Sequence, residues 1–233
     1  MKTRTWITAG FFIATLSACA SSTNAVFQTL RDVVKKDSAA ARAPLNPNYR
    51  YLRATIDGRV VLLVLGYTEN DPQGPIEVWY SAEREVLRIQ NGRLVGAVGL
   101  TTEWRNVAFS GAPSWAALKA SESASRWIRT RDVMPGYHYG IREALDIRAT
   151  KPPVRSALQE LDPQQLAWFE EWIEPEGLGQ RNATDNLLPL ARYAVAFQNG
   201  GETVVYGEQC LSPKLCFAWQ RWPAVSVSTN APR

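Results

Sequence analysis

In Tyr51-Leu-Arg-Ala-Thr-Ile-Asp-Gly-Arg-Val-Val-Leu-Leu-Val-Leu65, two apolar runs flank an Asp-Gly pair. Asp57 and Gly58 are residues that tolerate the positive φ angles of a two-residue type I′ turn. The flanking runs, Tyr51–Ile56 and Val60–Leu65, have the length and the β-branched content of strands. This stretch therefore predicts a β-hairpin.

The same arrangement recurs along the chain. Asn91-Gly92 separates two strand-like runs, and Asn199-Gly200-Gly201 separates two more. Because long helices do not alternate with these runs, we predict a mainly β fold, an antiparallel meander forming a curled sheet or barrel, with a short N-terminal helix and few other helices. The other predicted strands are Ile76–Ser81, Glu85–Gln90, Arg93–Val98, Arg192–Gln198, Glu202–Gln209 and Leu215–Trp222.

The middle of the chain has weaker patterns. Pro113–Ala124 predicts a short helix, whereas Ser125–Val133 and Arg142–Thr150 resemble strands. Gln164–Ile173 has helical spacing of its apolar residues and is equally compatible with a strand.

The N-terminus has the pattern of an export signal. Lys2 and Arg4 precede an apolar run, Trp6–Ala14, which is too short to cross about 30 Å of hydrocarbon. Leu16-Ser-Ala-Cys19 then matches a bacterial lipobox. We predict that residues 1–18 are a signal peptide and that Cys19 is lipidated, with palmitate among its acyl chains. Ala20 favours the outer membrane, with the domain facing the periplasm.

The mature chain divides into three parts. Residues 19–48 are predicted to be a tether, in which a short amphipathic helix through Val26, Leu30 and Val34 precedes a linker rich in Ala and Pro. This helix either packs on the domain or lies at the bilayer surface. Residues 49–225 are predicted to form a single β-rich domain, followed by a tail over 226–233.

Two cysteines remain after lipidation. Cys210 and Cys216 lie close together in an exported chain, and this predicts a disulfide. One such pair and a single histidine do not supply four zinc ligands, so we expect no metal and no cofactor. Loss of Lys2 and Arg4 leaves 24 basic against 22 acidic residues, which is not the charge balance of a nucleic-acid-binding protein.

Candidate catalytic residues are few. His138, the only histidine, lies among tyrosines, and no Gly-x-Ser-x-Gly segment supplies a nucleophile for it. Glu170 and Glu171 are sequence neighbours and would point to opposite faces of a strand, so they do not form the facing pair that glycoside hydrolysis needs. A distant acid such as Glu103 or Asp146 is the alternative partner for one of them, and the sequence does not identify which. We predict that the chain is not an enzyme.

Eight tryptophans follow residue 18, and we predict that most of them fill the core. Indole faces also stack on sugar rings. Trp168 and Trp172, which flank the adjacent acids, are the predicted glycan-contact residues.

Three stretches of the chain occur together: the Tyr51–Arg59 hairpin, Gly74-Pro-Ile-Glu-Val-Trp-Tyr-Ser81 and Asn91-Gly-Arg-Leu-Val95. In these stretches the chain resembles the YjbF/GfcB family of outer-membrane lipoproteins. This resemblance implies a barrel-like β fold and an accessory role in exopolysaccharide or group 4 capsule secretion. The implied partners are the membrane, reached through the lipid anchor, and polysaccharide-export proteins or an anionic polysaccharide. A polysaccharide-modifying enzyme and a lipid-carrier-like β-barrel remain as alternatives.

Overall fold

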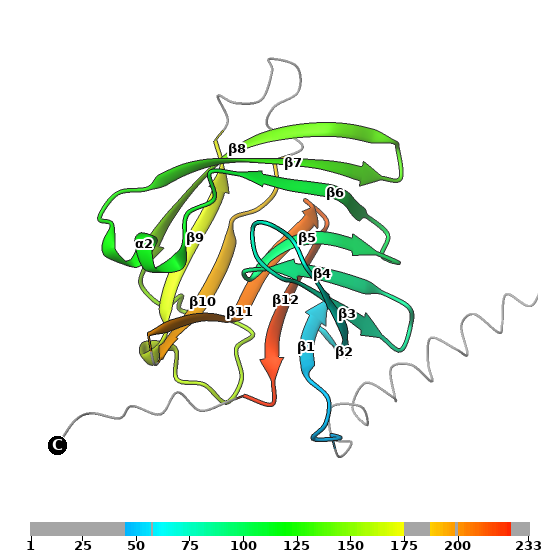
Figure 1. Cartoon of the computed structure of the whole chain (residues 1–233), viewed down its shortest axis with the longest axis horizontal. Helices are drawn as coiled ribbons and strands as arrows, with labels where there is room; N and C mark the ends of the chain where they lie inside the picture. Colours follow the sequence, from blue (N-terminus) through cyan, green and yellow to red (C-terminus); the bar gives the residue numbers. More distant parts are fainter. Residues whose placement is uncertain (1–44, 57, 175–186, 199, 225–233) are drawn as a thin grey trace, which may run out of the picture.

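The computed structural model describes residues 45–56, 58–174, 187–198 and 200–224. Within them, twelve antiparallel strands follow one another as a meander, and β1 also pairs with β12, which closes the sheet into a ring (Figure 1). The predicted mainly β meander is confirmed. The elements are β1 (Tyr51–Ile56), β2 (Arg59–Glu69), β3 (Ile76–Ser81), β4 (Val86–Gln90), β5 (Arg93–Val98), β6 (Glu103–Ser110), α2 (Trp115–Ala120), β7 (Ser125–Met134), β8 (His138–Thr150), η1 (Pro163–Gln165), β9 (Ala167–Ile173), β10 (Ala191–Gln198), β11 (Gly201–Ser212) and β12 (Leu215–Trp222).

The hairpin turns have the backbone that their residues predict. Asn91 and Gly92 have φ angles of 49° and 80°, the left-handed values of a type I′ turn. Gly92 is also required by packing, because a Cβ there would lie 2.3 Å from Cγ2 of Val204. The turn between β4 and β5 therefore folds against β11 at one end of the barrel.

Large aromatic side chains fill the interior and support the prediction that most tryptophans are core residues. Of the eight, six are buried: Trp79, Trp104, Trp115, Trp127, Trp168 and Trp219. Five of these belong to the main core, while Trp168 belongs to a smaller cluster.

That smaller cluster lies under the segment between β8 and β9. Leu158 and Leu161 from the segment pack with Trp168 and Tyr206. The segment is held by the backbone N–H of Ala157, which donates to the Tyr206 hydroxyl at 2.9 Å. It therefore forms a strap over one face of the sheet.

The helix α2 lies at the same end of the barrel as the β4–β5 turn. Ser114 caps it, because the Ser114 hydroxyl accepts a hydrogen bond from the backbone N–H of Ala117. Trp115 and Leu118 are its buried residues. The helix is shorter than the predicted Pro113–Ala124 segment.

Strand β6 is absent from the sequence-based prediction. Only Trp104 and Phe109 of its eight residues are buried, so apolar residues do not alternate along it. Asn106 has a positive φ of 49°, and the pairing with β7 shifts register between Arg105 and Ala108. This irregularity hides the two-residue period from pattern analysis.

The ambiguous segment Gln164–Ile173 forms the short turn η1 and then β9, so its strand alternative holds. The predicted signal peptide, Cys19, the tether helix and the tail over 226–233 lie outside the described residues. No helix in the described ranges is long and apolar enough to cross a membrane.

Candidate functional site

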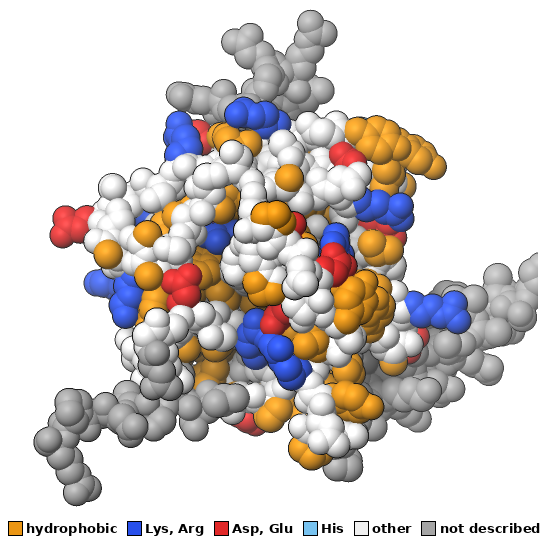
Figure 2. Space-filling model, in the orientation of Figure 1, with side chains coloured by type: hydrophobic (Ala, Val, Ile, Leu, Met, Phe, Trp, Pro, Cys, Tyr) orange, Lys and Arg blue, Asp and Glu red, His pale blue; other side chains and the backbone are white. Residues whose placement is uncertain are grey.

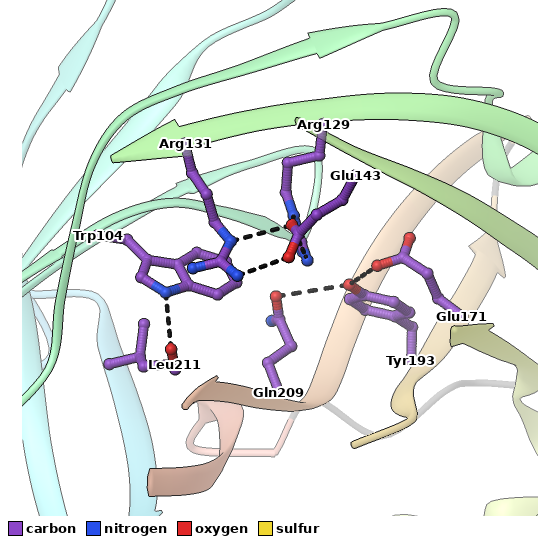
Figure 3. A network of polar contacts seen from close by, with 8 residues as sticks. All are labelled: Trp104, Arg129, Arg131, Glu143, Glu171, Tyr193, Gln209 and Leu211. Carbon is purple, nitrogen blue, oxygen red and sulfur yellow. Dashed lines mark hydrogen bonds and ion pairs between the residues drawn. The ribbon is translucent and has the colours of Figure 1, made fainter. Parts of the chain in front are cut away.

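A buried ion network lies inside the barrel at strands β6, β7 and β8 (Figure 3). Arg129 and Arg131 are two residues apart on β7 and so point to the same, inward face. Glu143 on β8 is the cross-strand partner of Arg129. Its carboxylate accepts hydrogen bonds from Arg129 Nε at 2.8 Å and from Arg131 Nε and Nη2 at 2.9 and 2.5 Å. One glutamate thus holds two arginines.

Both guanidinium groups lie over one indole ring. The Cζ atoms of Arg129 and Arg131 are 4.6 and 4.5 Å from the Trp104 ring centroid. Trp104 is fixed in turn, because its Nε1 donates to the carbonyl oxygen of Leu211 on β11 at 2.8 Å. Such stacking compensates part of the cost of burying the arginines.

The charge state of Glu143 follows from these contacts. Burial acts to raise the pKa of its carboxyl, but the attraction and hydrogen bonds of Arg129 and Arg131 outweigh it, so the pKa is lowered. Glu143 is therefore a carboxylate whose two oxygens are both engaged by arginine.

A second buried group surrounds Tyr193 on β10. Its hydroxyl lies 3.2 Å from Oε1 of Glu171 and 3.4 Å from Oε1 of Gln209 (Figure 3). The same Gln209 oxygen accepts the backbone N–H of Leu94 at 3.2 Å. Because Leu94 is on β5 and Gln209 on β11, this contact joins opposite walls of the barrel.

The pKa values of Glu171 and Tyr193 are raised, whereas the pKa of Glu143 is lowered. Burial raises the pKa of Glu171, and the nearby Arg93 and Arg129 only partly oppose it. Burial also raises the pKa of the Tyr193 hydroxyl well above its usual value. Both groups therefore favour their neutral forms more than they would in water.

The space beside this network is small. A cavity of about 20 Å³ is lined by Trp104, Arg129, Glu171 and Gln209, among others. That is room for about one water molecule. The filled, polar surroundings of the network differ from the wide apolar cavity that a lipid carrier requires.

Larger cavities lie at the end of the barrel that carries α2. One of about 430 Å³ and one of about 320 Å³ share three lining residues, Asn91, Trp115 and Glu202. We call them the mouth cavities. The larger is also lined by Gln73, Gln90, Arg93, Phe109 and residues 111–114, and the smaller by Arg50, Pro75, Glu77, Gly92, Thr203, Val204 and Arg221.

Trp115 forms the wall between the mouth cavities and the core. Its ring centroid lies 5.1 Å from that of Phe169 and 5.0 Å from that of Tyr193. Its Nε1 donates to the carbonyl oxygen of Asn91 at 2.9 Å. The Glu202 carboxylate accepts the backbone N–H groups of Trp115 and Ala116, which anchors the start of α2.

The predicted glycan-contact residues share one face of β9, but the strap covers only Trp168. Trp168 is only 1% exposed, and its Nε1 donates to the carbonyl oxygen of Pro163 under the strap. It offers no free ring face to a sugar in this structure. Trp172 is half-buried, with the Arg148 guanidinium 5.3 Å from its ring centroid. Contact with a glycan stays a prediction for Trp172.

The candidate catalytic acids do not converge. Glu171 is buried in the interior, whereas Glu170 is partly exposed and pairs with Arg192, as expected for neighbours on a strand. Asp146 pairs with Arg126, and Glu103 accepts the backbone N–H of Gly99 at the start of β6.

Two other predictions have simple outcomes. His138 is exposed at the start of β8. Cys210 and Cys216 form the predicted disulfide between β11 and β12. Within the described ranges, no three His, Cys, Asp or Glu side chains gather to hold a metal ion.

Sequence reasoning missed Arg93, Arg129, Arg131 and Glu143. A usable signal was present on β7, because Trp127 shares the inward face with both of its arginines by simple alternation. Charged residues in register with a buried tryptophan point to an internal ion network.

Comparison with known proteins identifies the family of the chain. The model of the family described as group 4 capsule polysaccharide lipoprotein gfcB, YjbF, matches residues 23–177, more than half of the chain. The chain belongs to the YjbF family. It is therefore a member of a lipoprotein family linked to capsule polysaccharide, and membership implies anchoring at a membrane.

A solved structure shares the YjbF-family chain's fold. It is the hypothetical lipoprotein YmcC from Escherichia coli (K12), with 17% sequence identity and a TM-score of 0.50. The alignment covers 88% of this chain and 97% of YmcC. Among the curated proteins, no relative matches.

Proposed function

We propose that this chain is a non-catalytic accessory lipoprotein of exopolysaccharide or capsule secretion. Removal of residues 1–18 leaves Cys19 as the lipidated N-terminus, and residues 19–48 tether the domain to the periplasmic side of the outer membrane. Its partners are polysaccharide-export proteins or the anionic polysaccharide itself. Membership of a family named for a capsule polysaccharide lipoprotein supports this role.

The engagement of Glu143 in the interior and of Glu202 and Glu77 at the mouth supports a role without catalysis. Glu143 is bound by two arginines, and Glu202 accepts two backbone N–H groups of α2. At the smaller mouth cavity, Glu77 accepts hydrogen bonds from Arg50 and Arg221. Hydrolysis of a glycosidic bond instead needs two carboxyl groups free to act on opposite sides of a sugar. This arrangement favours binding over the polysaccharide-modifying alternative.

The role is tested by deleting the gene and measuring the amount and chain length of surface polysaccharide. We expect less polymer or an altered length distribution, restored by the wild-type gene. Cys19→Ala tests the anchor separately: the variant should leave the membrane fraction and complement poorly. An unchanged polysaccharide in the deletion strain refutes the accessory role, and a variant that still sediments with membranes refutes the anchor.

Trp172 is the residue proposed to contact glycan on the outer wall. Trp172→Ala should weaken retention of the purified protein on immobilised polysaccharide from the same cells. Trp222 is a matched control, because it is also half-buried and lies 5.8 Å from the guanidinium of Arg53. Equal retention of the two variants would remove Trp172 from the contact surface.

A further inference from the structure

Arg93 at the base of the larger mouth cavity is a buried cation with an incomplete set of partners. It is 4% exposed, and its guanidinium lies 4.2 Å from the Trp115 ring centroid and 5.3 Å from that of Trp127. Its Nη2 donates to the carbonyl oxygen of Pro113 at 3.1 Å, whereas its buried Nε has no hydrogen-bond partner among the described residues.

The carboxyl group of Glu171 compensates the positive charge of Arg93 only weakly. Nε of Arg93 is 3.9 Å from Oε2 of Glu171, and that oxygen also lacks a hydrogen bond from the described residues. Burial raises the pKa of Glu171, so its negative charge is disfavoured. An unpaired buried charge is costly, and an incoming anion would relieve that cost.

The interior as a whole has an excess of positive charge. Among the described residues, three buried arginines, Arg93, Arg129 and Arg131, accompany two buried glutamates, Glu143 and Glu171. The buried Asp146 pairs with Arg126 and, by alternation along β8, lies on the opposite face from Glu143. Glu143 is fully used by Arg129 and Arg131, as described above. Arg93 lies outside that trio, and it borders the larger mouth cavity together with Glu202.

The lining of the mouth cavities carries both signs of charge, from Arg50, Arg93 and Arg221 and from Glu77 and Glu202. Figure 2 shows basic and acidic side chains interspersed with apolar ones on the face in view. A specific anion site at Arg93 is thus distinct from general attraction by a basic surface. Salt largely screens such attraction at distances beyond about 10 Å.

The lining of the mouth cavities suits a sugar. Gln73, Gln90 and Asn91 bring amide groups to the lining, and their oxygens can accept hydrogen bonds from sugar hydroxyls. Their nitrogens already donate to the carbonyl oxygens of Phe109, Gly74 and Gln73, which fixes the orientation of the amides. Each cavity falls within the range of about 300–1,000 Å³ that is typical of small-ligand sites. Because the two adjoin at Asn91, Trp115 and Glu202, they match linked units of a chain better than one small ion.

We propose that the mouth cavities bind a short segment of an anionic saccharide, with its acidic substituent beside Arg93 and the next sugar unit in the smaller cavity. This builds on the proposed function, which supplies the class of ligand. Arginine suits such a substituent because its planar donors match the oxygens of a carboxylate or a phosphate.

Calorimetric titration of the full lipidated chain in detergent tests the proposal. The probes are trigalacturonic acid, its carboxyl-reduced neutral counterpart and glucose 1-phosphate. We expect at least one acidic probe to bind about tenfold more tightly than the neutral one. The comparison of the two acidic probes distinguishes a carboxylate ligand from a phosphate ligand. Equal or absent binding of all three probes overturns the proposal.

Variants locate the site. Arg93→Gln should abolish the preference for the acidic probe, and Arg93→Lys should keep part of it. Ala112→Trp, at the exposed rim of the larger cavity, should block binding without removing a buried partner, which covers the case that Arg93→Gln does not fold. Arg105→Gln is the control, since Arg105 is an exposed arginine paired with Glu103. A preference that survives both Arg93→Gln and Ala112→Trp places the ligand elsewhere and overturns the proposal.

The outcome is separable from that of the proposed function. If deletion alters the polysaccharide but the wild-type protein shows no acidic preference, only the mouth site fails. If the acidic preference depends on Arg93 while deletion changes nothing, the site stands and the accessory role fails.

Discussion

Arg131 donates two parallel hydrogen bonds to the Glu143 carboxylate inside the barrel, from Nε at 2.9 Å and from Nη2 at 2.5 Å. This bidentate geometry is the strongest form of an arginine–carboxylate contact. Both side chains are almost fully buried, so neither has water as an alternative partner. Arg129 completes the network on the same carboxylate.

Removal of the Glu143 charge should destabilise the fold strongly. Glu143→Gln leaves two buried arginines without a counter-charge, and we expect a loss of about 3 kcal/mol or more in the free energy of unfolding. Chemical denaturation measures it. Glu170→Gln is the control, since the partly exposed pair of Glu170 with Arg192 is worth at most about 1 kcal/mol. Equal losses in the two variants would mean that the internal network is not a major source of stability.

Glu143 and Glu171 should have opposite effects on stability as the pH changes. The lowered pKa of Glu143 means that its contribution is present above its unfolded value of about 4.3 and is lost as the pH falls through the folded pKa. The raised pKa of Glu171 means that its ionisation costs stability as the pH rises above that same unfolded value.

The two glutamine variants separate these effects. Between pH 4 and 7, on either side of the unfolded pKa of about 4.3, Glu171→Gln should gain stability relative to the wild type, whereas Glu143→Gln should lose it. Unfolding curves recorded across this pH range provide the measurement. Parallel curves for both variants would contradict the assignment of opposite charge preferences.

The Cys210–Cys216 bridge closes a short loop between β11 and β12. In the chain-entropy account, replacing both cysteines by serine lowers the free energy of unfolding by about 2 kcal/mol. Reduction of the wild-type protein should produce a similar change, while the double variant should not respond to reductant. A variant as stable as the oxidised wild type would show that the bridge is energetically neutral.

Gly207 must be a glycine because Trp219 packs over it. The two are cross-strand partners, and a Cβ on Gly207 would lie 2.7 Å from Nε1 of the indole. Gly207→Ala should cost about 1–3 kcal/mol through overpacking. Gly201→Ala on the same strand is the control, since the closest atom to its added Cβ is a carbonyl oxygen at 3.5 Å. Thermal unfolding compares them, and similar midpoints would contradict the packing argument.

Local sequence chemistry predicts much of the fold. The strands Ile76–Ser81, Arg93–Val98 and Leu215–Trp222 match the predicted bounds, because their apolar runs end at turn residues. Strand β6 was not predicted, because its irregular backbone breaks the alternation of inward and outward residues on which pattern analysis depends. The Gln164–Ile173 segment stayed ambiguous because Trp168 and Phe169 are both buried, one under the strap and one in the interior.

The internal site was much less predictable than the strands. Arg93, Arg129 and Glu143 are far apart in sequence and resemble ordinary surface charges until the sheet closes. Their burial depends on which face each strand turns inward, and a shift of one residue reverses that face. The mouth cavities depend likewise on the β4–β5 turn meeting β11.

The sequence by itself determined the export signal pattern, most of the strand and turn order, and the pairing of Cys210 with Cys216, because each of these depends on residues that are close along the chain. Only the tertiary structure decided that Glu143 would hold two arginines, that Trp168 would be covered and that Arg93 would face a cavity. Those outcomes depend on which face each strand turns toward the interior, and the interior is enclosed only after β1 and β12 close the ring.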